Sequence, residues 1–142
     1  MKILIVDDDY TGRLLLQKIL CAYGECHMAV DGREAVDAYQ LAINQGASYD
    51  LICLDILLPI LDGQQVLAAI RDIEKNQPRR AKVLVTSVLG DRVGNLQAFR
   101  SQYDGCLTKP IAKEMVIDFL YASGLLLRDS ERSLQVGVAV EP

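Results

Sequence analysis

Five short apolar segments alternate with five segments of helical periodicity, and this order constrains the fold more than any other feature of the chain. Short apolar runs between polar breaks are typical of strands that are buried on both faces. We expect strands at residues 2–6, 25–30, 51–54, 82–86 and 106–108, and helices at residues 10–23, 33–45, 64–75, 91–102 and 112–124. Strict alternation of this kind predicts an α/β fold, in which a doubly wound, five-stranded parallel sheet carries helices on both faces.

Apolar residues at three- and four-residue spacing predict which side of each helix faces inward. In chain order these residues are Leu14, Leu15, Ile19 and Ala22; Ala35, Ala38, Tyr39 and Ala42; Val66, Leu67, Ile70 and Ile73; Val93, Leu96 and Phe99; and Met115, Val116, Phe119 and Leu120. Asp9 precedes the first helix. An aspartate at such a position commonly accepts hydrogen bonds from the first backbone N–H groups of the helix, so we expect Asp9 to be a cap.

Two of the expected strands run directly into aspartate. Residues 2–6 are followed by the pair Asp7 and Asp8, and residues 51–54 are followed by Asp55. Ligands bind outside the carboxyl ends of the strands in folds of this kind. If the two strands are neighbours, several carboxylates share one crevice, which is unfavourable unless a cation joins them or one carboxyl group stays protonated. The pattern therefore predicts a site for a hard divalent metal ion.

Two further polar residues end strands of the expected sheet. Thr86 ends the fourth strand, and Lys109 directly follows the fifth. Together with the aspartates they suit phosphoryl transfer, in which Asp55 would be the nucleophile that attacks phosphorus. Asp8, helped by Asp7, would hold magnesium, which prefers oxygen ligands. Lys109 and Thr86 would place an ammonium group and a hydroxyl group on the phosphoryl oxygens, so the chemistry would depend on positioning and electrostatics.

The charge balance and the cysteine pattern argue against other kinds of site. The net charge is -4, whereas binding to nucleic-acid phosphates requires a basic surface, so we expect no nucleic-acid partner. The four cysteines contain no C-x-x-C pair and His27 is the single histidine, which argues against zinc. No apolar segment approaches the length of a membrane span, and we expect a cytoplasmic protein without a membrane partner. His27 is expected to be a surface or half-buried residue.

Short motifs accompany each of the polar strand ends, in a fixed order. They are Ile5-Val6-Asp7-Asp8, Leu54-Asp55-Ile56-Leu57-Leu58-Pro59 with Asp62-Gly63, Val85-Thr86-Ser87, and Leu107-Thr108-Lys109-Pro110-Ile111. Each motif alone has little specificity, but the set in this order is specific. The chain resembles the response-regulator receiver domains of bacterial two-component signalling, and the resemblance covers roughly residues 1 to 125.

The resemblance implies a flavodoxin-like sheet with strand order 2-1-3-4-5 and a metal ion beside the acceptor. Asp55 takes the position of the phospho-acceptor. Asp7, Asp8, Asp55 and the backbone carbonyl oxygen of Leu57 take the positions of the protein ligands to Mg²⁺ or Mn²⁺. No other cofactor is expected.

The resemblance also implies how a signal would leave the site. Thr86 takes the position of the switch hydroxyl, and Lys109 that of the family's lysine, with a cis peptide bond before Pro110. The chain departs from the family at Cys106, where an aromatic residue is usual. A thiol cannot sweep the volume of an aromatic ring, so we expect signalling through backbone shifts of the loop after Thr86 and of the fourth helix. The output surface would consist of the fourth helix, the fifth strand and the fifth helix.

Our interpretation is a stand-alone receiver domain at residues 1–127, with a short tail at 128–142 that is disordered or forms an added strand. It would accept a phosphoryl group from a sensor histidine kinase or a phosphotransfer protein. It would then change its binding to an output partner, or to a second copy in a homodimer. It would not be an enzyme, apart from magnesium-dependent self-phosphorylation from phosphohistidine and slow self-dephosphorylation.

Three alternatives remain open from the sequence. A phosphorelay intermediate would pass the phosphoryl group to a histidine on another protein, which fits the absence of an aromatic residue at Cys106. An aspartate-nucleophile phosphatase usually has a second carboxylate two residues after the nucleophile, where this chain has Leu57. A flavin or nucleotide binder would share the fold, but no glycine-rich phosphate loop follows the first strand.

Overall fold

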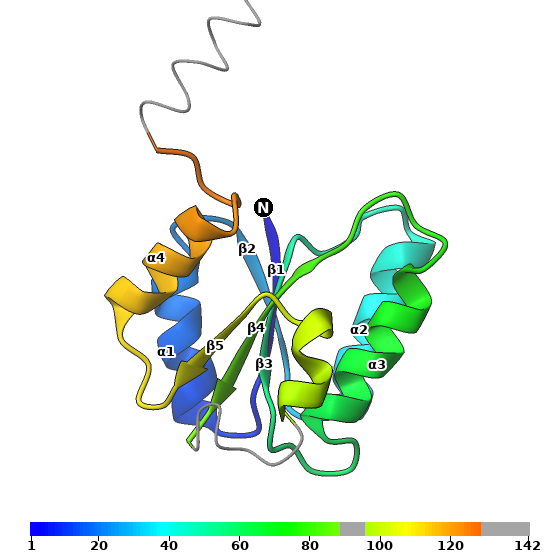
Figure 1. Ribbon diagram of the computed structural model, residues 1–142, viewed down its shortest axis with the longest axis horizontal. Helices are drawn as coiled ribbons and strands as arrows, with labels where there is room; N and C mark the ends of the chain where they lie inside the picture. The colour runs from blue at the N-terminus through cyan, green and yellow to red at the C-terminus, as the bar shows by residue number, and fades with distance from the viewer. Residues whose placement is uncertain (89–95, 129–142) are drawn as a thin grey trace, which may run out of the picture. The chain divides into compact units, whose positions relative to one another are not determined.

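The computed structural model describes residues 1–88 and 96–128, and the chain divides into two units, Met1–Ile111 and Ala112–Pro142. The first unit contains a five-stranded parallel sheet with strand order β2-β1-β3-β4-β5 (Figure 1). The strands are β1 (Lys2–Val6), β2 (Glu25–Ala29), β3 (Leu51–Asp55), β4 (Lys82–Ser87) and β5 (Gly105–Thr108). This arrangement confirms the doubly wound parallel sheet and the strand order that the sequence predicts.

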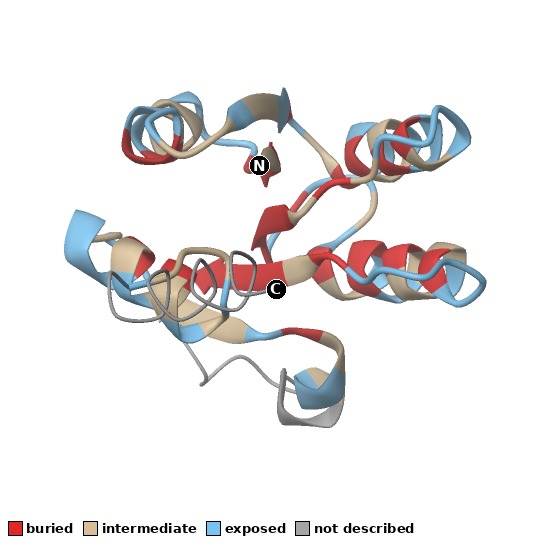
Figure 2. Ribbon diagram, turned by 90° about the horizontal axis from the view of Figure 1, so that it is seen from above, coloured by how far each residue is buried: buried red, intermediate tan, exposed pale blue. Residues whose placement is uncertain are grey.

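The helices of the first unit are α1 (Tyr10–Leu20), α2 (Gly32–Asn44), α3 (Gly63–Glu74) and the 3-10 helix η2 (Leu96–Gln102). Helix α1 lies on one face of the sheet, and α2 and α3 lie on the other (Figure 1). The central strands β1, β3 and β4 are largely buried, whereas the edge strands β2 and β5 are mostly intermediate or exposed (Figure 2). The core on the α2 and α3 side includes the expected residues Ala35, Tyr39, Ala42, Val66, Leu67 and Ile70, and all are buried. The second unit contains α4 (Lys113–Ala122).

Aspartate side chains begin three of the helices. The side chains of Asp9, Asp31 and Asp62 accept hydrogen bonds from backbone N–H groups in the first turns of α1, α2 and α3. At α3 the pairing is reciprocal, because Gln65 also accepts a hydrogen bond from the N–H group of Asp62. Such caps stabilise a helix by about 1 kcal/mol each. The cap expected at Asp9 is therefore confirmed.

Two predictions about helix faces were wrong. Helix α1 ends at Leu20, and its buried residues are Leu16, Ile19 and Leu20, whereas Leu15 is 40% exposed. Three consecutive leucines give no periodic signal, and the spacing to Ile19 and Leu20 selects Leu16 as the inward residue. In α4, Met115 is 44% exposed, and the buried residues are Val116 and Leu120, one helical turn apart.

The helix expected at residues 91–102 is described only in part. Residues 89–95, including Val93, lie outside the described residues, and the described remainder is the 3-10 helix η2. Phe99 in η2 packs against the core on the α2 and α3 side of the sheet. Residues 129–142 of the expected tail at 128–142 also lie outside the described residues. No helix within residues 1–88 and 96–128 is long and apolar enough to cross a membrane.

A half-buried arginine in the C-terminal part of α3 connects α3 to η2 and to the residue before β5. The guanidinium group of Arg71 donates hydrogen bonds to the carbonyl oxygens of Gln102, at 2.8 Å, and Ala81, at 2.9 Å. It also pairs with Glu74 at 2.7 Å and with Asp104 at 3.4 Å. One side chain therefore joins α3 to the start of β4, the end of η2 and the start of β5.

We predict that Ile70→Ala lowers the free energy of unfolding by about 2–5 kcal/mol, because it removes a fully buried side chain and leaves a cavity. Leu41→Ala is the matched control, since Leu41 is 56% exposed on α2, and its effect should stay within about 0.5 kcal/mol. Urea denaturation followed by circular dichroism measures both changes. Equal effects of the two substitutions would contradict the assignment of the core.

Candidate functional site

Three carboxylates meet at the carboxyl ends of two adjacent strands. Asp7 directly follows β1, Asp55 is the last residue of β3, and β1 pairs with β3. Ligand oxygens of Asp7, Asp8 and Asp55 all lie within 4.8 Å of one another. Asp7 and Asp55 are 1% and 5% exposed, whereas Asp8 is exposed. The chain thus places these residues in one acidic crevice that opens to solvent at Asp8.

The N-cap and the first turns of α1 hold Asp7 in place. The N–H group of Asp9 donates a hydrogen bond to Oδ1 of Asp7 at 2.9 Å, and the guanidinium group of Arg13 donates to its carbonyl oxygen at 2.8 Å. A Cβ atom at Gly12 would lie only 2.6 Å from Oδ2 of Asp7, so a larger residue would displace the carboxylate. The sequence pattern did not predict these roles of Gly12 and Arg13. A glycine in the first turn of a helix is unfavourable, and this could have signalled a close approach.

The Asp55 carboxylate is held through both oxygens. Oδ1 accepts a hydrogen bond from the N–H group of Leu57 at 3.0 Å, and Oδ2 lies 3.2 Å from Nζ of Lys109. Burial raises the pKa of Asp55 above its usual value of 3.8, and the nearby charge of Asp7 adds to the rise. The Leu57 N–H group and Lys109 partly offset this change in pKa. The negative charge of Asp55 is therefore only partly compensated by its neighbours.

Lys109 joins the two buried carboxylates. It follows β5, and its Nζ lies 2.9 Å from Oδ2 of Asp7 and 3.2 Å from Oδ2 of Asp55. Burial lowers the pKa of Lys109, but the hydrogen bonds and charges of Asp7 and Asp55 outweigh burial and raise the pKa above 10.5. Lys109 is therefore charged at neutral pH. The Lys109–Pro110 peptide bond is cis, as the resemblance implied.

Thr86 and Leu57 complete the set of residues that the sequence singled out. Thr86 lies in β4, is 1% exposed, and is the Cα partner of Asp55 in the β3–β4 register. Leu57 is 51% exposed, and nearby Ile60 and Val88 are 81% and 62% exposed. The acidic crevice therefore has exposed apolar side chains on loops that follow β3 and β4. A ligand role for the Leu57 carbonyl oxygen stays a prediction.

The donor set of the crevice suits a hard divalent cation. Three carboxylates carry three formal negative charges, and the ammonium group of Lys109 can balance only one of them. Carboxylate oxygens are the ligands that Mg²⁺ and Mn²⁺ prefer, and a partly exposed site leaves room for the waters that Mg²⁺ retains. Asp7, Asp8 and Asp55 would hold the ion.

His27 lies apart from this site, as the sequence predicted. Its Nδ1 is 2.7 Å from the hydroxyl group of Tyr49 and its Nε2 is 2.7 Å from Glu25. The side chain is 38% exposed. None of the four cysteines, all of which belong to the described part of the chain, forms a disulfide, and Cys53 is buried while Cys106 is half-buried.

Comparisons of the sequence and of the structure with known proteins point to the same family. The family described as the response regulator receiver domain matches residues 3–121. The chain is 32% identical over 135 residues to the transcriptional regulatory protein SrrA of Staphylococcus aureus, covering 94% of this chain and 51% of SrrA. It is 28% identical over 120 residues to hybrid signal transduction histidine kinase I of Dictyostelium discoideum, covering 84% of this chain and 7% of the kinase. The chain thus spans about half of one relative's length and a small part of the other's.

A solved structure with the same fold contains magnesium. It is the CheX–CheY–BeF₃–Mg²⁺ complex from Borrelia burgdorferi, of which a matched chain has a TM-score of 0.70 and 26% identity. The match covers 87% of this chain and 89% of that chain.

We predict that Mg²⁺ raises the thermal stability of the protein, because it binds the folded acidic crevice. At a concentration of 100 times Kd the gain is about 2.7 kcal/mol. Asp8→Asn should abolish most of this gain. Asp9→Asn is the matched control, since asparagine caps a helix as well as aspartate does and the neighbouring charge is removed. A scan of melting temperature against Mg²⁺ concentration measures both, and an unchanged response in Asp8→Asn would contradict the site.

Proposed function

Because the chain belongs to the response regulator receiver domain family, we propose that it is a phosphorylation-driven switch of a two-component system with Asp55 as the phospho-acceptor. Receiver domains are signalling switches that interact with histidine kinases and phosphotransfer proteins. The observation that carries the proposal is the joint contact of Lys109 with Asp7 and Asp55 in a crevice that also includes Asp8. We assign the receiver domain to residues 1–127, of which the family match covers 3–121.

The chemistry derives from the position of Asp55. A carboxylate oxygen of Asp55 attacks the phosphorus of a phosphohistidine, the new O–P bond forms as the P–N bond breaks, and the imidazole leaves and takes up a proton. A bound Mg²⁺ or Mn²⁺ supplies positive charge to the phosphoryl oxygens. Lys109, which already contacts Asp55 at 3.2 Å, neutralises part of the charge on the transferred group. Burial of Asp55 strengthens these charge interactions.

Phosphorylation of Asp55 then changes the output surface through Thr86 and Lys109. The added charge draws Thr86 and Lys109 toward the phosphoryl group, and each of them lies at the end of a strand. A ligand or modification of this kind shifts an existing equilibrium between two arrangements. The output surface comprises the segment after Thr86, η2 and β5, and the partner or a second copy binds there.

A phosphorelay intermediate is the second candidate function. Cys106 stands where the family usually has an aromatic residue, and a relay protein needs no aromatic readout. In that case Asp55 returns the phosphoryl group to a histidine of a phosphotransfer protein. Both functions use the same acceptor chemistry and differ in the later fate of the phosphoryl group.

We predict that incubation with radiolabelled acetyl phosphate and Mg²⁺ labels the protein, and that Asp55→Asn abolishes the label because it removes the nucleophile. Lys109→Gln should slow labelling by about 100-fold or more, the usual cost of one charge-stabilising group. Asp9→Asn should be labelled at the original rate. Persistent labelling of Asp55→Asn would show that another residue accepts the phosphoryl group.

We predict that the fate of the phosphoryl group separates the two functions. For a switch, the label leaves mainly as inorganic phosphate, at a rate that an added phosphotransfer protein does not change. For a relay, the label moves to the histidine of that protein faster than hydrolysis releases it. Mixing the labelled receiver with a purified phosphotransfer protein and following both products over time measures the partition. Predominant hydrolysis with every phosphotransfer protein of the source organism would exclude the relay.

A further inference from the structure

We propose that Gly12 is a positioning residue for Asp7, because the space left by its missing side chain holds the Asp7 carboxylate where it can share a divalent cation with the other carboxylates of the crevice. The effect on metal binding rests on the metal site of the proposed function, whereas the contact between Gly12 and Asp7 does not. Gly12 lies in the first turn of α1, and Asp7 directly follows β1.

The carboxylate of Asp7 occupies the space that a side chain at Gly12 would need. A Cβ atom at Gly12 would lie 2.6 Å from Oδ2 and 3.2 Å from Cγ of Asp7, whereas ordinary contact begins at 3.4 Å. The position of a Cβ atom is fixed by the backbone of the helix, so no rotamer of a larger residue avoids this contact. Because Asp7 is buried, its carboxylate would have to move by several tenths of an ångström within a packed site.

The hydrogen bonds of Asp7 would change with such a movement. Oδ1 accepts a hydrogen bond from the N–H group of Asp9 at 2.9 Å. Oδ2, the oxygen nearest to Gly12, accepts one from Nζ of Lys109 at 2.9 Å, and the same Nζ lies 3.2 Å from Oδ2 of Asp55. A displacement of Oδ2 therefore moves Lys109 or breaks its hydrogen bond to Asp7.

The local structure of α1 does not require glycine at this position. Among the described glycines, Gly46 and Gly124 occupy the left-handed region, and Gly12 does not. Its N–H group donates to Oδ2 of Asp9 at 3.1 Å, and a Cβ atom would lie 3.5 Å from that oxygen, which is an ordinary contact. Glycine also destabilises a helix relative to alanine. The close approach of Asp7 is therefore the feature of the structure that accounts for glycine here.

The position of Asp7 matters because a metal site tolerates little displacement of its ligands. Ligand oxygens of Asp7, Asp8 and Asp55 lie within 4.8 Å of one another, which is close enough for one cation to contact all three. Altering a residue that holds a metal ligand in place commonly lowers metal affinity by about 10- to 100-fold. Gly12 acts in this way through the space it leaves, since it provides no ligand atom of its own.

A cleft beside Gly12 allows the effect of the Cβ atom to be separated from the effect of side-chain size. The cleft has a volume of about 330 Å³, and its lining includes Gly12, Leu15, Val88 and Ile111. The outer atoms of a longer side chain can enter this cleft, whereas the Cβ atom meets Asp7 in every case. A small and a large substitution should therefore displace Asp7 to the same extent.

The test is the affinity of the full-length protein for Mn²⁺, measured from the electron paramagnetic resonance signal of the free ion. We expect Gly12→Ala and Gly12→Leu to weaken binding by about tenfold or more, and to similar extents. Thr11→Ala is the matched control, since Thr11 is an exposed neighbour in the same turn of α1, and it should leave the affinity unchanged. Unchanged affinity in Gly12→Ala, or a loss that grows with side-chain size, would overturn the proposal.

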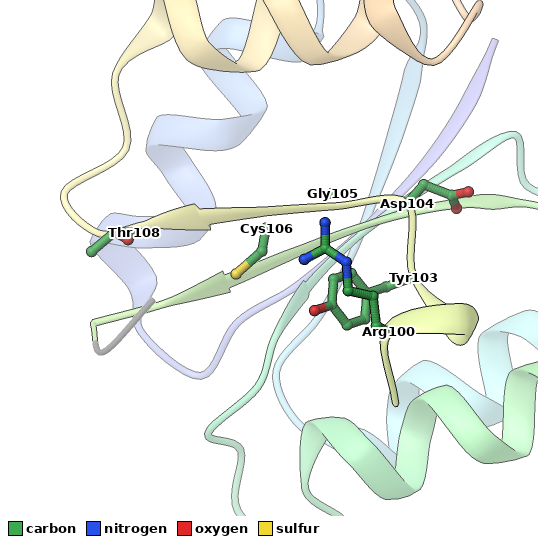
Figure 3. Close-up of a pocket in the computed structure, with 6 residues that line it drawn as sticks. All are labelled: Arg100, Tyr103, Asp104, Gly105, Cys106 and Thr108. Carbon is green, nitrogen blue, oxygen red and sulfur yellow. The ribbon is translucent and has the colours of Figure 1, made fainter. Parts of the chain in front are cut away.

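A second control adds volume to a cleft that lies outside the acidic crevice. The cleft between η2 and β5 has a volume of about 350 Å³ and is lined by Arg100, Tyr103, Asp104, Gly105, Cys106 and Thr108 (Figure 3). Cys106→Val places a larger side chain there and should leave the Mn²⁺ affinity unchanged. A loss equal to that of Gly12→Ala would show that added volume elsewhere has the same effect, and would overturn a specific role of Gly12.

Melting temperatures in the presence of a chelator test the contact without metal. In the Asp7→Ala background, Gly12→Ala should raise the melting temperature, because alanine favours the helix and no carboxylate is displaced. In the unsubstituted protein the same change should lower it, because it disturbs the hydrogen bonds of Asp7. Equal changes in the two backgrounds would show that the residues act independently and would overturn the proposal.

The side chain of Lys109 provides a readout that needs no second substitution. In the metal-free protein, Gly12→Ala should shift the ¹H–¹³C signal of Lys109 Cε, and Thr11→Ala should not, because the effect passes through Oδ2 of Asp7. An unshifted signal would overturn the proposal even if the Asp7→Ala background does not fold. Failure of the unsubstituted protein to bind Mn²⁺ would instead overturn the metal site of the proposed function, and the Lys109 signal would still decide whether Gly12 positions Asp7.

Discussion

Repulsion among the three carboxylates at the ends of β1 and β3 is the constraint on which the site depends. Two of them, Asp7 and Asp55, are buried, and Lys109 is a cation that contacts both. One ammonium group cannot balance three carboxylates, so the crevice favours further positive charge, and the proposed transfer of a dianionic phosphoryl group would require a cation there. In the proposed switch, the same imbalance would make the position of Lys109 sensitive to a group added to Asp55. The proposed chemistry and the proposed signalling would therefore have one electrostatic origin.

The convergence of the carboxylates was predictable because it depends on strand order. Parallel neighbours end at the same edge of a sheet, so Asp7 and Asp55 had to meet once β1 and β3 were adjacent. The location of Lys109 at the end of β5 was predictable. Its hydrogen bonds to both aspartates were not, since they depend on side-chain geometry. The capping role of Asp9 was predictable from local chemistry alone. These features depend on backbone order and short-range contacts, which a sequence expresses directly.

The features that escaped prediction depend on packing between distant segments. The Leu14–Leu15–Leu16 run has no period of its own, and tertiary contacts select Leu16 as the buried residue. Gly12 lies close to the carboxylate of Asp7, and Arg13 donates a hydrogen bond to the carbonyl oxygen of Asp7, across the turn between β1 and α1. These contacts can be recognised only from the three-dimensional positions of the Asp7 oxygens. Arg71 joins Gln102, Ala81 and Asp104, which are up to 33 residues away from it. No local pattern in the sequence identifies such a contact.

Cys106 separates the two questions that the site raises. The proposed acceptor chemistry involves Asp55, Lys109 and the acidic pair, and none of the contacts among them includes the thiol. Cys106 instead lines a cleft between η2 and β5. A relay requires only that the protein stay folded when it is phosphorylated. A switch requires that the phosphorylated and unphosphorylated forms bind a partner with different affinity. Thr108 ends β5 and directly precedes Lys109, so a movement of Lys109 would reach β5, and the two proposed functions differ in whether a partner responds to that movement.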